Sequence, residues 1–210
     1  MRDGRARAAT ASGGHVNIAD APPFPTVAPH AAHGPNERLV VLHFREEIAA
    51  RIGTLARCIR EDYRGRDLAV LGVLTGGFVF VADLVRALDR PLTVDFVGLS
   101  SYGAGRTSSG RVVMTKPPTT TITGRDVLVV EDLLDTGRSM RFLLDTLRAL
   151  KPRSLRLCVL VDKRARRTTS VEAHYVGFTI DDGFVVGYGI DGGGRHRWIP
   201  DLCRLEEVPG

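Results

Sequence analysis

One stretch of the sequence, residues 124–150, constrains the fold of this chain more than any other. It opens with an apolar run rich in β-branched residues, Val127 to Val130, as expected of a central parallel strand that is covered on both faces. Apolar residues then recur at helical spacing until Lys151-Pro152 ends the pattern; they are Met140, Leu143, Leu144, Leu147 and Leu150. Because a strand followed by a helix places the connecting loop at the carboxyl end of the strand, we expect a ligand site there.

The loop between this strand and helix is expected over residues 131–139, and its two halves favour different partners. The first half holds the carboxylates of Glu131, Asp132 and Asp135. The second half consists of Thr136, Gly137, Arg138 and Ser139. Hydroxyls, a glycine and the backbone N–H groups of a helix start form a phosphate cradle, whereas carboxylates suit hydroxyls or a metal ion. A ligand with a phosphate and a ribose diol meets both demands; an ordinary acidic helix start, the alternative, accounts for only part of the pattern.

This segment resembles the phosphoribosyl diphosphate (PRPP) motif of the type I phosphoribosyltransferases, and Asp135 resembles the residue of the branch that acts on 6-oxopurines. The resemblance to hypoxanthine-guanine phosphoribosyltransferases extends from Arg38 to Val208. It implies an open, mainly parallel α/β sheet with helices on both faces. It also implies a small hood made from Leu39 to His43 and the C-terminal segment, with the base bound between sheet and hood.

The resemblance also implies roles for the residues of this loop. Glu131 and Asp132 are expected on the ribose hydroxyls, directly or through a metal ion. Asp135 is expected on N7 of the purine as general acid or base. The 5'-phosphate is expected to bind to the four residues that follow Asp135, namely Thr136, Gly137, Arg138 and Ser139.

Two further segments resemble the base-binding residues of the family. Lys163 follows the strand predicted over Leu155 to Val161 and corresponds to the lysine that contacts O6 of the purine. An ammonium group only donates hydrogen bonds, so it suits a keto oxygen and cannot accept from an exocyclic amine. Phe184 corresponds to the ring that stacks on the base, although an aromatic residue in a strand is also typical of a core. Val185 corresponds to the residue whose main chain contacts the base edge.

A second glycine-bearing loop follows the apolar strand predicted over Leu68 to Leu74. It reads Thr75-Gly76-Gly77 and precedes an apolar helix predicted over Phe78 to Leu88. A glycine pair lets amide groups approach an anion, but it also forms ordinary turns. The resemblance assigns this loop to pyrophosphate. Relatives usually carry Lys or Arg in place of Thr75, so the binding is expected to rest on the backbone amides.

The remaining pyrophosphate contacts are expected near the C-terminus. Asp191 corresponds to a ligand of the pyrophosphate-bound magnesium ion, a hard cation that favours carboxylate oxygen. Glu131 and Asp132 are further candidate metal ligands, and Mg²⁺ is the implied cofactor. Arg197 corresponds to an arginine that contacts pyrophosphate. Between Asp191 and Arg197, the run Gly192-Gly193-Gly194 replaces larger residues of the relatives.

Small polar residues follow the strand predicted over Leu92 to Leu99, and residues 100–110 have the composition of a mobile loop. A surface hairpin is the alternative. Ser101 and Tyr102, with Gly103, match the flexible loop that closes over PRPP in the family and keeps water from the reacting carbon. Val112 to Thr115 is expected to be the return strand. The charged run Arg164 to Arg167 is interpreted as a solvated loop.

Composition and length limit the rest of the chain. With 210 residues and 43% hydrophobic content, one sizeable core is expected. Residues 1–36 are rich in Ala, Gly, Pro and His and are predicted to be a disordered tail, leaving residues 37–210 as the catalytic domain. The net charge of +5 is spread out, which suits anionic substrates and does not favour nucleic acid. The few scattered cysteines favour a reduced cytoplasm, and no run is long enough to span a membrane.

Together these features predict a purine-salvage enzyme that transfers the 5-phosphoribosyl group from PRPP to N9 of hypoxanthine or guanine. The products would be IMP or GMP and pyrophosphate, and the protein is expected to be a homodimer or homotetramer. Two alternatives remain: the same fold with xanthine as the preferred base, and a non-enzymatic RNA-binding regulator on this fold. The set Asp135, Lys163, Phe184 and Asp191 argues against the regulator.

Overall fold

The structure is a computed structural model that describes residues 36–102 and 111–208. The predicted tail, apart from Asn36, and the centre of the predicted mobile loop lie outside these residues. The elements follow in the order β1 (Glu37–His43), α1 (Arg45–Asp62), β2 (Leu68–Leu74), α2 (Phe78–Leu88), β3 (Thr93–Tyr102), β4 (Arg111–Lys116), β5 (Asp126–Leu134), α3 (Arg138–Ala149), β6 (Ser154–Asp162), the 3₁₀ turn η2 (Arg164–Arg166), β7 (Tyr175–Thr179), β8 (Phe184–Val186) and β9 (Leu202–Glu207).

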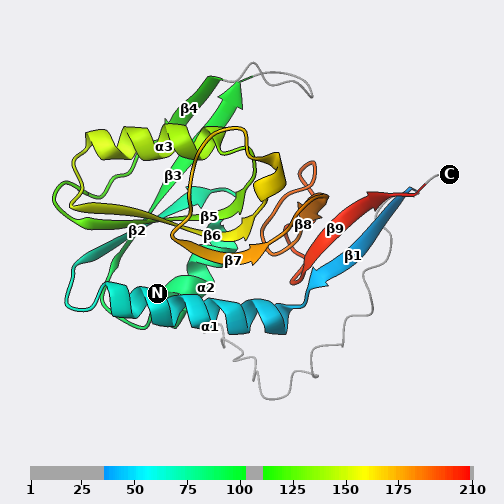
Figure 1. Cartoon of the computed structure of the whole chain (residues 1–210), viewed down its shortest axis with the longest axis horizontal. Coiled ribbons are helices and arrows are strands. Elements are labelled where there is room, and N and C mark those ends of the chain that lie inside the picture. The colour runs from blue at the N-terminus through cyan, green and yellow to red at the C-terminus, as the bar shows by residue number, and fades with distance from the viewer. Residues whose placement is uncertain (1–35, 103–110, 209–210) are drawn as a thin grey trace, which may run out of the picture. The chain divides into compact units, whose positions relative to one another are not determined.

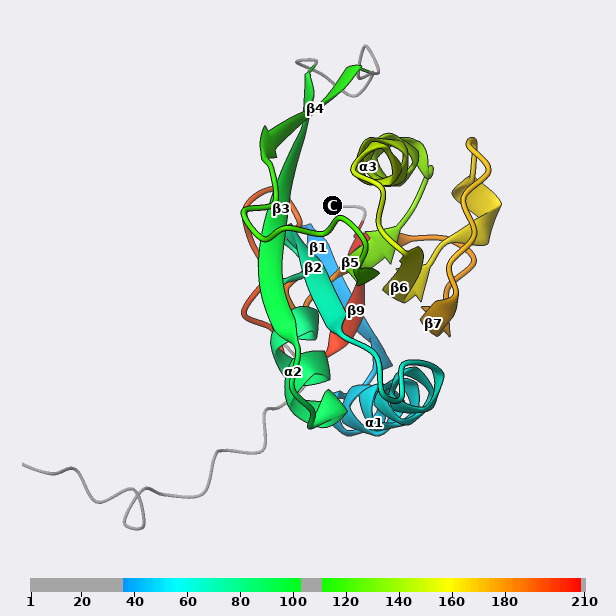
Figure 2. The ribbon, with the colours of Figure 1, turned by 90° about the vertical axis from the view of Figure 1, so that its left-hand side faces the viewer.

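The larger sheet has six strands in the order β4-β3-β2-β5-β6-β7. Its neighbours are parallel except for β3 and β4, which form an antiparallel pair. Helices α1 and α2 cover one face and α3 covers the other (Figures 1 and 2). The predicted open, mainly parallel α/β sheet with helices on both faces is therefore confirmed. None of the helices in the described part of the chain is both long and apolar enough to cross a membrane.

The hood is a separate three-stranded antiparallel sheet in the order β1-β9-β8 (Figure 1). Strand β1 pairs along its length with β9, so the predicted partnership of residues 39–43 with the C-terminal segment is confirmed. Strand β8 completes this sheet by pairing Phe184 with Leu205 and Val186 with Cys203. The chain thus places Phe184 on the hood and Lys163 at the end of the main sheet.

Each face of the main sheet has its own apolar core. An apolar stripe of α1, Ile48, Ile52, Leu55 and Ile59, packs on one face together with Tyr63, which follows the helix. All five are at most 6% exposed and form one cluster with residues of α2. The stripe of α3 packs on the other face with alternate residues of β5. Alternation along β5 explains this division, because Leu128 and Val130 belong to the first cluster and Val127 and Val129 to the second.

Two predictions about strands need correction. Glu131 and Asp132 were expected in a loop, but β5 continues to Leu134 because it keeps pairing with β6, Glu131 opposite Val159 and Leu134 opposite Asp162. The second error is an omission: β7 extends the sheet beyond β6 and was not predicted. Its sequence is short and contains Gly177, whose Cα packs against Leu160 so closely that a Cβ could not be accommodated.

Asp95, on β3, anchors the β3–β4 hairpin. Its carboxylate is only 9% exposed and accepts N–H donors from Phe96 (2.7 Å), Thr119 (2.6 Å) and Thr120 (2.8 Å), and the Lys116 ammonium (3.1 Å). Burial alone would raise the pKa of Asp95, but these donors outweigh it and hold the pKa well below its ordinary value. The ionised carboxylate therefore stabilises the hairpin that leads into the predicted mobile loop.

We expect Asp95→Asn to lower the free energy of unfolding by about 2 kcal/mol or more, because charge-assisted hydrogen bonds are lost inside the fold. Since the folded-state pKa is depressed, this stabilisation is present above the unfolded pKa of about 3.9 and is lost as the pH falls below it. Urea unfolding between pH 7 and pH 3 measures both effects. Asp67→Asn is the control, since its ion pair with Arg125 leaves Asp67 65% exposed. Equal stability loss in the two variants would contradict this role of Asp95.

Candidate active site

The loop between β5 and α3 forms the start of a phosphate cradle. Gly137 caps α3 with φ at 85°, and a Cβ there would lie 2.7 Å from the carbonyl oxygen of Thr169. Only glycine fits this conformation and this close approach. No side chain caps α3, so its first-turn N–H groups are available to an anion. A pocket of about 240 Å³ lies at this loop and is lined by Val73, Leu74, Leu99, Glu131, Leu133, Leu134, Asp135, Thr136, Gly137, Ser139 and Met140.

The predicted pyrophosphate loop, residues 75–77, lies against Asp132. With its neighbour Glu131, Asp132 forms an acidic pair on β5. A Cβ on Gly76 would overlap the Asp132 carboxylate, so this approach requires glycine. Gly77 caps α2, and Thr75 is exposed. The Gly77 N–H donates to the Val73 carbonyl oxygen (3.2 Å), so the prediction that all the amides of this loop bind pyrophosphate needs correction: those of Thr75 and Gly76 remain the candidates. The structure therefore brings together two segments that are far apart in the sequence, residues 75–77 and Asp132.

The acidic pair differs in environment along β5. Burial raises the pKa of Glu131 well above its ordinary value, and the neighbouring Asp132 carboxylate raises it further. Asp132 is 8% exposed, and its Oδ1 accepts a hydrogen bond from the Leu133 N–H (2.9 Å). Two carboxyl groups held this close form a site that gains from a neutralising cation or from hydroxyl donors.

The segment carrying Asp191 and Arg197 reaches the same region. Arg197 donates to the Gly189 carbonyl oxygen (2.6 Å) and forms an ion pair with Asp191 (Nη2–Oδ2, 3.3 Å). A Cβ on Gly189 would lie 2.6 Å from the Gly76 carbonyl oxygen, so this segment packs directly on the predicted pyrophosphate loop. The structure thus places both residues beside that loop.

The glycine run after Asp191 forms a tight turn. Gly193 and Gly194 have positive φ angles of 62° and 80°, and the Gly194 N–H donates to Asp191 Oδ1 (2.7 Å). A turn of this conformation suits glycine better than residues with a side chain. The turn lies between Asp191 and Arg197, which remain close enough to form their ion pair.

The predicted base-binding residues differ in exposure. Lys163 is 2% exposed, and its ammonium donates to the Gly183 carbonyl oxygen (2.5 Å), next to Phe184. Phe184 is 52% exposed, which is unlike a core residue and leaves its ring available for stacking, while Val185 is 3% exposed. The Lys163 N–H also donates to the Leu134 carbonyl oxygen (3.0 Å), which ties the base-binding residues to the β5–α3 loop.

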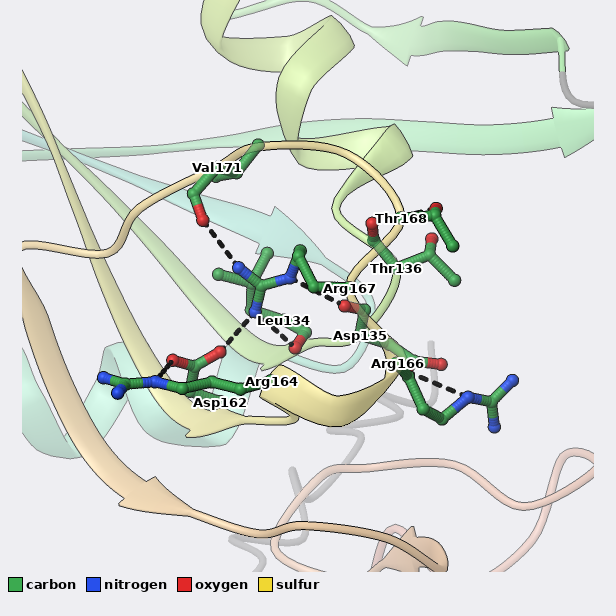
Figure 3. Close-up of polar contacts among 9 residues, drawn as sticks. All are labelled: Leu134, Asp135, Thr136, Asp162, Arg164, Arg166, Arg167, Thr168 and Val171. Atoms are coloured by element: carbon green, nitrogen blue, oxygen red, sulfur yellow. Dashed lines mark hydrogen bonds and ion pairs between the residues drawn. The ribbon is translucent and has the colours of Figure 1, made fainter.

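Asp135 lies beside a residue that the sequence did not single out. The Arg166 Nε lies 3.4 Å from Asp135 Oδ1, an oxygen that is buried and accepts no hydrogen bond within residues 36–102 and 111–208 (Figure 3). The interpretation of Arg164 to Arg167 as a solvated loop is therefore wrong in part. Arg164 and Arg166 are exposed, but the Arg167 side chain is only 16% exposed and contacts the same loop. The sequence pattern does not distinguish Arg167 from the neighbouring arginines. Its burial becomes visible only in the fold, where residues 163–169 return to the β5–α3 loop.

The flexible-loop residues Ser101 and Tyr102 lie at the end of β3, and their side chains, with residues 103–110, lie outside the described part. Leu99, two positions earlier, lines the pocket at the β5–α3 loop, so β3 leads toward that pocket. Arg138, the remaining residue of the predicted phosphate cradle, begins α3 and is exposed.

The acidic residues of the site suit magnesium. The described residues contain no group of three or more His, Cys, Asp or Glu side chains that could hold a metal ion without other ligands. Magnesium commonly binds to one or two carboxylates together with substrate phosphates. The oxygen donors of Glu131, Asp132 and Asp191, next to the predicted pyrophosphate loop, fit that mode of binding.

Comparisons with known proteins agree with this geometry. The family model of the phosphoribosyl transferase domain matches residues 42–192. A hypoxanthine-guanine phosphoribosyltransferase of Aquifex aeolicus is 41% identical over 172 residues, which cover 81% of this chain and 97% of that protein. A bifunctional TilS/HprT protein of Listeria innocua is 41% identical over 171 residues, and there the chain spans only 26% of the relative's length.

A comparison with solved structures also finds a hypoxanthine-guanine phosphoribosyltransferase. The crystal structure of a hypoxanthine-guanine phosphoribosyltransferase from Bacillus anthracis superimposes with a TM-score of 0.75 at 37% identity, covering 81% of this chain and 100% of that chain. These matches confirm the resemblance and the type of sheet that it implied. The chain therefore belongs to the phosphoribosyltransferase family, in the branch of the hypoxanthine-guanine phosphoribosyltransferases.

Proposed function

We propose that this protein transfers the 5-phosphoribosyl group of PRPP to N9 of hypoxanthine or guanine and releases pyrophosphate. The observation that carries this proposal is the single pocket of about 240 Å³ in which Glu131, Asp135 and the start of α3 at Gly137 meet. Lys163 is hydrogen-bonded to the wall of that pocket through the Leu134 carbonyl oxygen. Carboxylates suited to a ribose and amides suited to a phosphate thus line one pocket, and the main chain of the residue with the buried ammonium is bonded to its wall.

The proposed roles follow from the chemistry of each group. As the bond to pyrophosphate breaks, positive charge grows on C1 of the ribose, and the carboxylates beside the sugar stabilise it electrostatically. Asp135 serves the purine N7 as general acid or base. Arg197 and the amides of Thr75 and Gly76 hold pyrophosphate, since the Gly77 N–H already donates to the Val73 carbonyl oxygen. Magnesium, held by Asp191 with Glu131 and Asp132, would supply charge neutralisation on the pyrophosphate when bound.

Pyrophosphate release tests this function. The purified protein should release pyrophosphate from PRPP only when magnesium and a 6-oxopurine are both present, in equal amounts with the nucleoside monophosphate formed. A panel of hypoxanthine, guanine, xanthine and adenine identifies the preferred base. If xanthine were the only base of the four that is turned over, the alternative with xanthine as the preferred base would be favoured. Absence of turnover with every base, together with tight RNA binding, would favour the regulator and overturn the proposal.

Thr75 offers a prediction specific to this chain. We expect Thr75→Lys to lower the KM for PRPP a few-fold with kcat little changed, because a charge-assisted contact to pyrophosphate is worth about 1.5–3 kcal/mol before solvent screening at this exposed position. Steady-state kinetics with varied PRPP measures the effect. Thr54→Lys is the control: it introduces a lysine at a partly exposed position of α1 and should leave the KM for PRPP unchanged. An unchanged KM would mean that a side chain at position 75 does not reach pyrophosphate.

The proposal includes self-association as a homodimer or homotetramer and a cytoplasmic location. Apolar side chains on the surface support self-association: Trp198 is 66% exposed and Phe78 is 42% exposed, and both line one pocket of about 400 Å³. Exposed apolar clusters of this kind are typical of protein contacts. Light scattering during size-exclusion chromatography measures the mass, and a monomer at micromolar concentration would exclude a stable oligomer.

A further inference from the structure

Three consecutive carbonyl groups, at the end of β5 and in the β5–α3 loop that follows, all accept hydrogen bonds from one returning segment, residues 163–169. The Leu134 oxygen accepts from the Lys163 N–H (3.0 Å) and from Arg167 Nη2 (3.2 Å). The Asp135 oxygen accepts from Arg167 Nε (2.9 Å). The Thr136 oxygen accepts from the N–H groups of Thr168 (3.0 Å) and Thr169 (3.1 Å). Figure 3 shows Arg167 reaching toward the first two of these carbonyl groups.

Arg167 lies at the centre of this arrangement. Besides the two loop carbonyls, its guanidinium binds the Asp162 carboxylate and the Val171 carbonyl oxygen (2.6 Å) (Figure 3). Both partners of the ion pair are largely buried, with side chains 16% and 6% exposed. A planar guanidinium can satisfy several acceptors at fixed angles, which an ammonium group cannot. Arg167 therefore connects the ends of β5 and β6 to the chain that follows η2.

This bonding fixes the direction of the loop amides. In a planar trans peptide the C=O and the N–H of the next residue point in opposite directions. Because the carbonyls of Leu134, Asp135 and Thr136 point to the returning segment, the N–H groups of residues 135–137 point away from it. Carbonyl oxygens that would repel a phosphate are thereby held on the far side of the loop.

The packing between the two segments leaves little freedom. A Cβ on Gly137 would lie 2.9 Å from the Arg167 Cδ and 2.7 Å from the Thr169 carbonyl oxygen. Asp162, the ion-pair partner of Arg167, directly precedes Lys163, the predicted contact of the base. Movement of the guanidinium would thus disturb the phosphate loop and the base-binding lysine together.

From these contacts we propose that Arg167 is a positioning residue for the 5'-phosphate loop and couples that loop to Lys163. The nature of the ligand rests on the proposed function, whereas the ordering of residues 134–137 does not. Arg167 contacts neither substrate in this role; it acts through the orientation of the loop. Its loss should weaken PRPP binding more than it slows turnover.

The test compares Arg167→Met, which keeps side-chain length without the donors, with Arg125→Met. The Arg125 side chain is similarly protected, 21% exposed, and donates to Asp67 and Thr93, but it lies just before β5, at the opposite end of that strand. We expect Arg167→Met to raise the KM for PRPP about tenfold or more, with a smaller fall in kcat, since two loop carbonyls lose a charged donor. Amide exchange in residues 134–139 should accelerate in the same variant. Arg125→Met should change neither.

Two further variants keep the outcome unambiguous. Arg164→Met removes an exposed partner of the same Asp162 carboxylate and should leave the KM for PRPP unchanged. Arg167→Lys keeps the charge but not the fork of donors, so it should give an intermediate KM; it also serves if Arg167→Met does not fold. Unchanged amide exchange at 134–139, or an equal rise in KM in the Arg125 variant, would overturn the role of Arg167. If the wild-type protein forms no nucleotide, the proposed function fails, but amide exchange still decides on Arg167.

Discussion

Asp135→Asn should lower kcat by about 10²–10⁴-fold while the KM for PRPP changes little, because a carboxamide cannot exchange a proton with N7 of the purine. The substitution keeps the shape of the side chain, so the contact with Arg166 and the backbone bond to Arg167 can persist. Steady-state kinetics with hypoxanthine and PRPP varied in turn measures both constants.

Asp145→Asn is the matched control for this prediction. Asp145 is an exposed aspartate on α3, 52% accessible, that also pairs with arginines, Arg141 and Arg148. Its substitution should leave kcat unchanged, since Asp145 lies outside the predicted site and an exposed ion pair contributes little to the stability of the fold. A kcat for Asp135→Asn within a factor of three of the wild type would remove Asp135 from acid–base catalysis and leave it a role in binding.

The second large effect is expected in base selectivity. Lys163→Gln should lower kcat/KM for hypoxanthine by about 10²-fold and narrow the preference for hypoxanthine over adenine, because an amide can accept from an exocyclic amine. The Gln amide can still donate toward the Gly183 carbonyl oxygen that Lys163 Nζ contacts, so the local fold should persist. Competition between hypoxanthine and adenine at fixed PRPP gives the selectivity directly.

Lys151→Gln provides the comparison, since Lys151 is an exposed lysine after α3 and has no predicted contact with the base. It should leave both kcat/KM values and their ratio unchanged. Selectivity that is the same in Lys163→Gln and wild type would mean that another group contacts the 6-substituent. The buried ammonium would then have a structural role through Gly183 alone.

Where the local sequence pattern is strong, the first and last residues of an element could be predicted from the sequence. Strand β2 and helix α2 have the predicted bounds, because a continuous apolar run is followed by a glycine pair and then by a strongly apolar helix. The hood was predicted from resemblance and not from pattern. Its strands pair across the whole domain, from Glu37 to Glu207, and such distant pairing leaves no local signature.

Other elements depended on contacts that no local pattern encodes. Carboxylates favour loops over strands, yet Glu131 and Asp132 lie in β5 because pairing with β6 continues past them. Strand β7 was not predicted, since its five residues include Gly177. In both cases pairing with the adjacent strand β6, and not the intrinsic propensity of the residues, determines that the segment is a strand.

The candidate site shows the same division. The polar residues that line the pocket at the β5–α3 loop were predicted because they lie in one short run, from Glu131 to Ser139. The apolar lining from Val73, Leu74 and Leu99 was not, because these residues come from other strands. The approach of Gly76 to Asp132 and of Gly189 to Gly76 became visible only in the fold. Arg167 could not be separated from a solvated basic run, because its burial depends on a chain segment that returns to the loop 30 residues after Gly137.

The most direct measurement of the central claim is a crystal structure of the protein with IMP, pyrophosphate and magnesium. The 5'-phosphate should accept hydrogen bonds from the amides of residues 136–139, Lys163 Nζ should lie within hydrogen-bond distance of O6, and Phe184 should stack on the purine. Pyrophosphate should lie between residues 75–77 and Arg197. IMP bound away from the pocket at the β5–α3 loop, or bound there with its base turned away from Lys163, would contradict the account.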